Sequence, residues 1–191
     1  MIDVSLLQRL EEGVERDGLV VRRLRVGDEG AVTEAVKASL EHLRPWMPWA
    51  AAEPLTPVDR RALLATWERA WSSGAERNVG VFDGPSVVGV AGLTDRPGPG
   101  AREIGYWTHV GHLRRGVAST AASLLTELAW EDPAINRVEI HHDKANVASG
   151  GVPRRLGYRR IGERERAPQA PAETGVEVVW ALARPSGGAA S

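Results

Sequence analysis

The chain has 191 residues, a length that allows one sizeable core. Its charge is nearly balanced, with 24 Lys and Arg against 25 Asp and Glu, which argues against a general nucleic-acid-binding surface. The absence of cysteine excludes disulfides, a thiolate nucleophile and a cysteine-ligated metal. No apolar run is long enough for a membrane span and the N-terminal segment is not typical of a secretory signal, so we expect a cytoplasmic protein without a membrane partner.

The first half of the chain predicts two helices between strands. Apolar residues recur at helical spacing from Asp28 to Leu43, and the two prolines within residues 44–49 end that helix. Thr56 as a cap, with Pro57 in the first turn, predicts the start of the second helix. The strands predicted in this half are residues 19–26, 78–82 and 86–93, the last two joined by a tight turn.

The second half alternates strands and helices. After a Pro/Gly-rich loop, the predicted elements are strand 102–109, helix 116–130, strand 136–142, helix 147–156, and an antiparallel pair of strands, 158–163 and 176–182. The first three of these should form a right-handed crossover with its two strands side by side. We therefore expect a mixed α/β fold with helices on both faces of one sheet, as a single domain over residues 1–183 with a disordered tail, 184–191.

A glycine turn that leads into an apolar helix is the most informative segment. Arg114, Arg115 and Gly116 come directly before the helix that begins at Val117 and Ala118. The first N–H groups of a helix have no internal partner and carry partial positive charge, so this turn predicts a phosphate site, with an ordinary loop as the alternative. It is neither a Walker A loop nor a dinucleotide fingerprint, since the Gly-Lys-Ser/Thr and G-x-G-x-x-G patterns are absent. The phosphate would belong to another carrier.

Over roughly residues 18–183 the chain resembles the GNAT-type N-acetyltransferases, and within them the RimJ/RimL branch, which acetylates the N-terminal amines of ribosomal proteins. Three motifs carry the resemblance, in this order: His42 to Trp49 with its paired tryptophans; Glu103 to Trp107 leading into Arg114 to Ala118; and Asn146 to Ser149 followed by Leu156-Gly157-Tyr158. The resemblance implies a mostly antiparallel sheet, acetyl-CoA as co-substrate without a metal, and homodimerisation.

The resemblance also implies a cofactor site. In such enzymes the glycine turn holds the acetyl-CoA pyrophosphate, the end of the preceding strand pairs with the pantetheine arm, and the third motif contacts the arm and the sulfur. The residues placed there by the resemblance are Trp107, Thr108, His109, Arg114, Arg115, Gly116, Val117, Ala118, Ser119, Asn146 and Ser149.

This sequence departs from the family pattern at two points. Leu113 stands where the family prefers Gln or Arg, but backbone N–H groups make most contacts there. Gly150, Gly151 and Pro153 stand where relatives carry helix formers, and Pro153 predicts a helix that begins late or kinks.

Acetylation of an amine requires a base, an oxyanion donor and a proton for the leaving thiolate. Glu103 resembles the position of the base in many relatives; the alternative is a solvated Glu103 paired with Arg102. The backbone N–H of Thr108 or His109 could stabilise the oxyanion. Ser149 could protonate the thiolate, or it could be a plain helix cap.

Tryptophans and histidines complete the candidate residues. We expect Trp46 and Trp49 to line an acceptor pocket, and Trp67 and Trp71 to be core residues on one helix face. The pair His109-x-x-His112 lacks further ligands for a metal. His141-His142-Asp143 lacks the spacing of the double-histidine motif of other acyltransferases, and its histidines should lie on opposite faces of a strand. The absence of G-x-S-x-G argues against a serine hydrolase.

These observations predict an acetyl-CoA-dependent transferase that acetylates a primary amine directly, either a protein or peptide N-terminus or a small molecule. One alternative is a non-catalytic acyl-CoA-binding sensor or partner module on the same fold. Another is a transferase that uses a different donor, such as succinyl-CoA.

Overall fold

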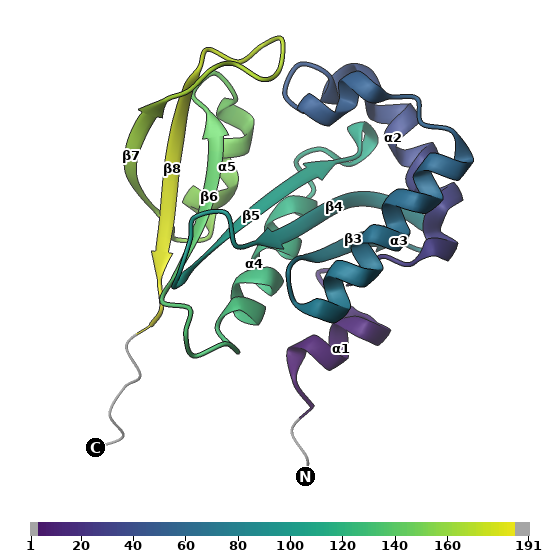
Figure 1. Ribbon diagram of the computed structural model, residues 1–191, viewed down its shortest axis with the longest axis horizontal. Coiled ribbons are helices and arrows are strands. Elements are labelled where there is room, and N and C mark those ends of the chain that lie inside the picture. Colours follow the sequence, from purple (N-terminus) through teal and green to yellow (C-terminus); the bar gives the residue numbers. More distant parts are fainter. Residues whose placement is uncertain (1–3, 186–191) are drawn as a thin grey trace.

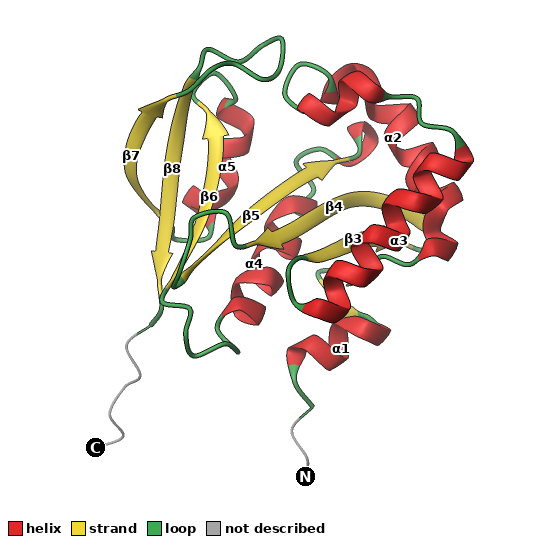
Figure 2. Cartoon of the chain, viewed as in Figure 1, coloured by secondary structure: helices red, strands yellow, loops and turns green. Residues whose placement is uncertain are grey.

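The computed structural model describes residues 4–185, which form one mixed sheet with helices on both faces (Figures 1 and 2). The strand order is β1-β2-β3-β4-β5-β6-β8-β7, and only β5 and β6 pair in parallel among the described strands. The strands are β1 Val14–Arg16, β2 Leu19–Arg23, β3 Arg77–Asp83, β4 Ser86–Thr94, β5 Ala101–Thr108, β6 Arg137–Asp143, β7 Arg159–Glu165 and β8 Val176–Ala183. The predicted fold class is confirmed.

Two layers of helices cover the sheet, and α2 and α3 lie on the opposite face from α1, α4 and α5 (Figure 1). The helices are α1 Leu6–Glu12, α2 Glu29–Leu43, α3 Pro57–Ser73, α4 Val117–Ala129 and α5 Val147–Arg155, with short 3₁₀ turns η1 Val26–Asp28, η2 Pro48–Ala52 and η3 Val110–His112. As predicted, Thr56 caps α3 through the N–H of Asp59. None of the helices within residues 4–185 is long and apolar enough to cross a membrane.

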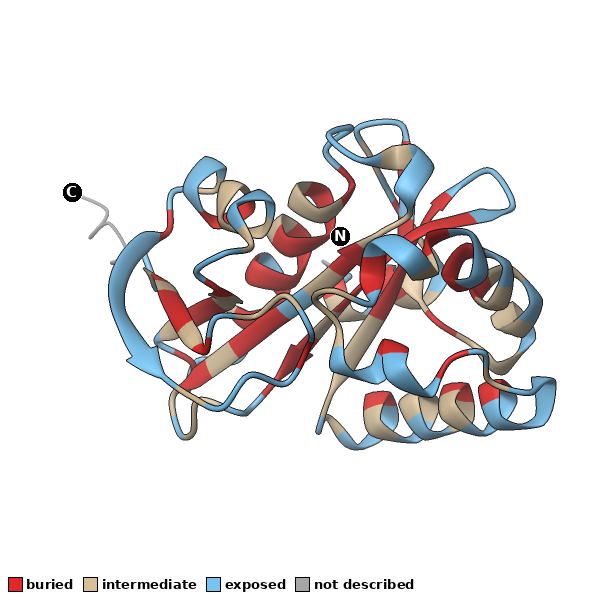
Figure 3. Cartoon of the chain, turned by 90° about the horizontal axis from the view of Figure 1, so that it is seen from above, coloured by how far each residue is buried: buried red, intermediate tan, exposed pale blue. Residues whose placement is uncertain are grey.

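Each face of the sheet has its own core, because side chains alternate along the strands. Val88 and Ile104 face α4, where they pack with fully buried helix residues such as Leu125. Val90 faces the other side of the sheet, where its cluster contains Val36 of α2 and Leu64 of α3. Figure 3 shows these buried segments in the middle of the molecule, whereas the edge strand β7 is exposed along its whole length.

The N-terminal helix α1 and the short strand β1 were not predicted. Ser5 begins α1 with a capping box, and Leu6 and Leu10 bury its inner face. Glu131, just beyond α4, accepts hydrogen bonds from the backbone N–H groups of Leu6 and Leu7. The predicted first strand ends at Arg23 rather than at residue 26, since η1 and an Arg22–Asp28 ion pair of 2.7 Å follow it.

The predicted tail begins at a residue that is held in place. The backbone N–H of Arg184 donates to the carbonyl of Asn136 (2.8 Å), and its guanidinium donates to the carbonyls of Trp130 and Ile135. Residues 186–191 of the predicted tail lie outside the described part of the chain.

The feature of the fold that positions the site is the divergence of β5 from β6. Their parallel pairing covers only Ala101 to Glu103 against Arg137 to Glu139, whereas β5 stays paired with β4 as far as Thr108. Beyond Glu103 the two strands separate, and in Figure 1 β5 runs away from the β6–β8–β7 part of the sheet. The sheet therefore contains an open gap beside the last residues of β5.

Candidate active site

A cavity of about 970 Å³ opens beside this gap. One wall comes from the end of α2, η2 and α3, and the opposite wall comes from β5, β6, β8 and the β7–β8 loop. A backbone hydrogen bond joins the two walls, since the N–H of Ala172 in that loop donates to the carbonyl of Pro45 after α2 (3.0 Å). This hydrogen bond connects the two walls of the cavity.

Tryptophans form the first wall of the cavity. Trp46, Trp49 and Trp67 line it, and Trp107 comes from β5 in the opposite wall; the ring centroids of Trp49 and Trp107 lie 6.1 Å apart at a tilt of 50°. The expectation that Trp67 is only a core residue is wrong in part, because it packs against the core and also lines the cavity. Trp71 is a core residue as predicted, 4% exposed, and its indole N–H donates to Glu11.

Glu103 is the last residue of β5 that pairs with β6, and it lines the cavity. Its side chain is 11% exposed, and its carboxylate lies 3.4 Å from Arg96 and 3.6 Å from the Nδ1 of His141. The alternative of a solvated glutamate paired with Arg102 is wrong, because alternation along the strand places Arg102 on the other face.

On the α5 side of the gap, Tyr106 and Ser149 form a pair that the sequence analysis missed. The Tyr106 hydroxyl donates to the carbonyl oxygen of Ser149 (2.9 Å) and lies 3.2 Å from its Oγ. Burial raises the pKa of Tyr106 to about 12, so the phenol stays protonated at neutral pH. The strand alternation that separates Tyr106 from Glu103 is the sequence signal that could have identified it.

Helix α5 begins directly after Asn146, not late, and Pro153 lies inside it. Asn146 is its cap, since Oδ1 of Asn146 accepts from the N–H of Ser149 (3.2 Å), so the alternative of Ser149 as the cap is wrong. The close approach of His142 explains why residue 150 is a glycine, because a Cβ at this position would lie 2.7 Å from the imidazole Nε2.

His142 is fixed on this side of β6. Its Nε2 accepts from the indole N–H of Trp180 (3.0 Å), and its Nδ1 lies 2.8 Å from the carbonyl of Asp143. His141 lies next to Glu103 and Glu177 instead, which confirms that the two histidines lie on opposite faces of β6. Among residues 4–185, no cluster of three or more His, Asp and Glu side chains is arranged to hold a metal ion.

The glycine turn lies between β5 and α4, with Gly116 at the N-cap of the helix. Its φ of +83° is left-handed, and Arg114 also has a positive φ of +60°, so the turn is tight. The N–H of Val110 donates to the Oγ of Ser39 in α2 (3.0 Å), which ties the turn to that helix. Val117, Ala118 and Ser119 form the first turn of α4, where N–H groups have no partner within a helix.

Of the two backbone N–H groups predicted to stabilise the oxyanion, one already donates a hydrogen bond within the sheet. The N–H of His109 donates to the carbonyl of Val88 in β4 (2.9 Å). Because N–H groups alternate in direction along a strand, the N–H of Thr108 points to the gap side of β5. The His109 ring accepts from the N–H of Gly111, and burial together with the nearby His112 lowers its pKa.

Comparisons with known proteins agree with this arrangement. Residues 18–159 match the family model described as the acetyltransferase (GNAT) domain. The Bacillus subtilis (strain 168) protein named "Putative ribosomal N-acetyltransferase YdaF" is 26% identical over 148 residues, which cover 76% of this chain and 80% of that protein.

Two solved structures share the fold. One is Mycobacterium smegmatis RimJ in complex with CoA-disulfide, with a TM-score of 0.73 and 19% identity over 86% of this chain and 81% of that chain. The other is the microcin C7 self-immunity acetyltransferase MccE in complex with acetyl-CoA and AMP, with a TM-score of 0.80 and 14% identity over 88% of this chain and 94% of that chain. Because the family model matches well over half of this chain, the chain belongs to the GNAT family of acetyltransferases.

Proposed function

We propose that this protein transfers the acetyl group of acetyl-CoA to the α-amine of a protein or peptide N-terminus. The observation that carries the proposal is the gap between β5 and β6, which has a buried carboxylate on one face and a half-buried hydroxyl pair on the other. The bound cofactors of RimJ and MccE and the name of the Bacillus relative support the same donor and acceptor classes.

The gap fits an extended acyl-CoA arm. From Ile104 to Thr108 the side of β5 that faces away from β4 continues beyond the β6 pairing, so its backbone groups can bind an arm as they would bind a strand. The pyrophosphate would lie at the first turn of α4, against Val117 to Ser119, with Arg114 and Arg115 beside it. Asn146, Trp107 and His109 would complete the cofactor site.

The chemistry follows from the two faces of the gap. Glu103 accepts the proton of the attacking amine, whose nitrogen then bonds to the thioester carbonyl carbon. The N–H of Thr108 stabilises the oxyanion. When the C–S bond breaks, Ser149 or Tyr106 protonates the thiolate; the raised pKa keeps the Tyr106 proton in place until that step.

The acceptor would reach Glu103 along the wall of tryptophans, where Trp46 and Trp49 contact it. An α-amine titrates near ~8 and a lysine amine near ~10.4, so an N-terminus is deprotonated at lower cost at neutral pH. The aromatic wall suits the flat surface and apolar side chains of a peptide.

Thiol release from acetyl-CoA tests the proposal, with short peptides, lysine derivatives and small amines as acceptors. We expect turnover with peptides that have a free N-terminus, none with N-acetylated controls, and acetyl-CoA binding in calorimetry. Turnover with succinyl-CoA but not acetyl-CoA would mean that the donor is succinyl-CoA. Turnover with small amines alone would mean that the acceptor is a small amine and not an N-terminus. Binding without turnover would favour the acyl-CoA sensor.

A further inference from the structure

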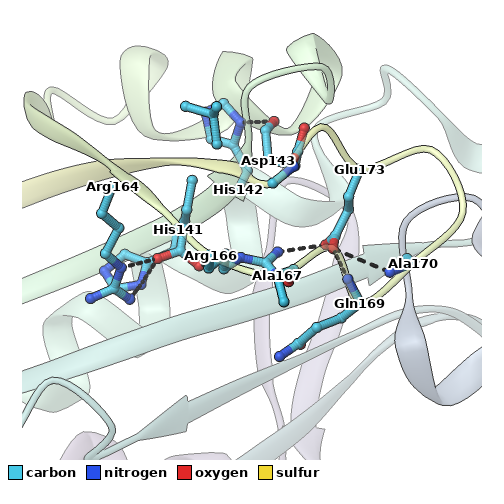
Figure 4. A network of polar contacts seen from close by, with 12 residues as sticks. His141, His142, Asp143, Arg164, Arg166, Ala167, Gln169, Ala170 and Glu173 are labelled. Carbon is cyan, nitrogen blue, oxygen red and sulfur yellow. Dashed lines mark hydrogen bonds and ion pairs between the residues drawn. The ribbon is translucent and has the colours of Figure 1, made fainter.

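His141 is enclosed by carboxylates at the point where β5 and β6 begin to separate. Its side chain is only 5% exposed. Its Nε2 lies 2.7 Å from Glu139, and its Nδ1 lies 3.6 Å from both Glu103 and Glu177. Arg164 approaches the same Nδ1 at 3.2 Å, as Figure 4 shows. The imidazole is thus in contact with side chains from β5, β6, β7 and β8.

The surrounding charges are themselves paired. Arg96 lies 3.4 Å from Glu103, Arg137 lies 2.5 Å from Glu139, and Arg164 and Arg166 both pair with Glu177. Two of these arginines, Arg96 and Arg164, have mostly exposed side chains.

These contacts determine which imidazole nitrogen carries the proton in the neutral ring. The guanidinium of Arg164 is only a donor, so the Nδ1 that it contacts must be the acceptor. The Nε2 proton is then donated to Glu139, which holds the ring in this tautomer. The unprotonated nitrogen of the neutral ring is therefore Nδ1, which lies 3.6 Å from Glu103, the base of the proposed function.

We propose that His141, oriented by Glu139, is a positioning residue that accepts the substrate proton from Glu103. This inference rests on the proposed function. The proton moves from the amine nitrogen to Glu103, and from the Glu103 carboxyl to Nδ1 of His141. The Nε2–H bond is kept throughout, so the ring becomes an imidazolium between Glu139 and Glu177. Arg164 loses its acceptor on Nδ1 but keeps Glu177 as its partner.

The need for such a residue follows from the chemistry of Glu103. The pKa of a glutamate carboxyl is ordinarily ~4.3, so its carboxylate is a weak base toward an amine at neutral pH. An imidazole, near ~6.5, is better matched to an amine at neutral pH. Because Glu103 is buried, a second acceptor behind it would let it release each proton before the next turnover.

Kinetics of the full chain over pH, with acetyl-CoA and the best peptide of the panel, test the inference. We expect His141→Gln to lower kcat by ~10²-fold and to change the shape of the pH profile, with acetyl-CoA affinity unchanged in calorimetry. Glu139→Gln should change the profile in the same direction. The matched control is His42→Gln, at an exposed position of α2 outside the site, which should keep the wild-type profile.

A loss of kcat in His141→Gln with an unchanged profile shape would mean a structural role and would overturn the inference. The ¹⁵N spectra of labelled histidine provide a test without turnover: neutral His141 should carry its proton on Nε2, and its titration should respond to Glu103→Gln. The opposite tautomer, or no response, would also overturn it. Wild-type protein without turnover would refute the proposed function, and the spectra would still decide the coupling of His141 to Glu103.

Discussion

Gly150 and Gly151 are neighbours in α5, yet replacing each by alanine should change stability in opposite directions. A Cβ on Gly150 would lie 2.7 Å from Nε2 and 2.9 Å from Cε1 of His142. The imidazole cannot move freely, because Trp180 and the carbonyl of Asp143 hold its two nitrogens. A Cβ on Gly151 would meet only the end of the Arg155 side chain, at 3.3 Å, which can swing away.

The magnitudes follow from these contacts. Overpacking costs about 1–3 kcal/mol, and loss of the Trp180–His142 hydrogen bond costs about 1 kcal/mol. Alanine regains about 1 kcal/mol over glycine in a helix. Gly150→Ala should therefore destabilise the protein by about 1–3 kcal/mol, and Gly151→Ala should stabilise it by up to about 1 kcal/mol. At about 2–4 °C per kcal/mol for a chain of this size, the two melting temperatures should separate clearly.

Thermal unfolding followed by circular dichroism measures both variants against wild type. The cause is checked in a His142→Ala background, where Gly150→Ala should no longer destabilise and should behave like Gly151→Ala. Equal melting temperatures for Gly150→Ala and Gly151→Ala in the wild-type background would refute the assignment of Gly150 to close packing against His142.

Three further predictions concern the site and two buried tyrosines. Glu103→Gln should lower kcat by ~10²-fold or more with little change in acetyl-CoA affinity, measured by thiol release and calorimetry; an unaltered pH–rate profile would remove Glu103 from the mechanism. Gly116→Val should abolish acetyl-CoA binding, because valine disfavours the φ of +83° and its side chain obstructs access to the backbone. The far-ultraviolet circular dichroism spectrum should stay unchanged. Unchanged affinity would remove the turn from the cofactor site. Burial raises the pKa values of Tyr106 and Tyr158 to about 12 from an ordinary 10.0, so the folded state holds these protons when the unfolded state has lost them. Stability should therefore be fully present below pH 10 and fall as the pH rises toward 12, and Tyr106→Phe should reduce that fall in urea titrations; an equal alkaline loss in the variant would count against the burial argument.

The sequence predicted those elements whose signals are local. The periodic residues from Asp28 to Leu43 and the cap at Thr56 define α2 and α3 without reference to the rest of the chain. Helix α1 was missed because only Leu6 and Leu10 mark its buried face, and its stability depends on Glu131, far away in sequence.

The same distinction holds for the candidate site. The glycine turn and the motif around Asn146 are each a continuous stretch of sequence, so both could be assigned to the right elements from the sequence alone. The position of His141 beside Glu103 depends on the register between β5 and β6 and on where it ends, which no local pattern reveals. Tyr106 likewise meets Ser149 only because α5 packs against the far face of the gap.

The docking of α1 and the position of β8 between β6 and β7 bear on how this protein can be shortened for laboratory work. The family model spans residues 18–159, but trimming to those limits would remove Leu10, which is fully buried, and the whole of β8, which lies between β6 and β7. Such a fragment would present water with an unpaired β6 edge and an open core, and we expect it to aggregate. A fragment that starts at Ser5 and ends after Arg184 keeps the cap of α1 and the carbonyl contacts of Arg184, and we expect no difference between this fragment and the full chain in their rates of limited proteolysis.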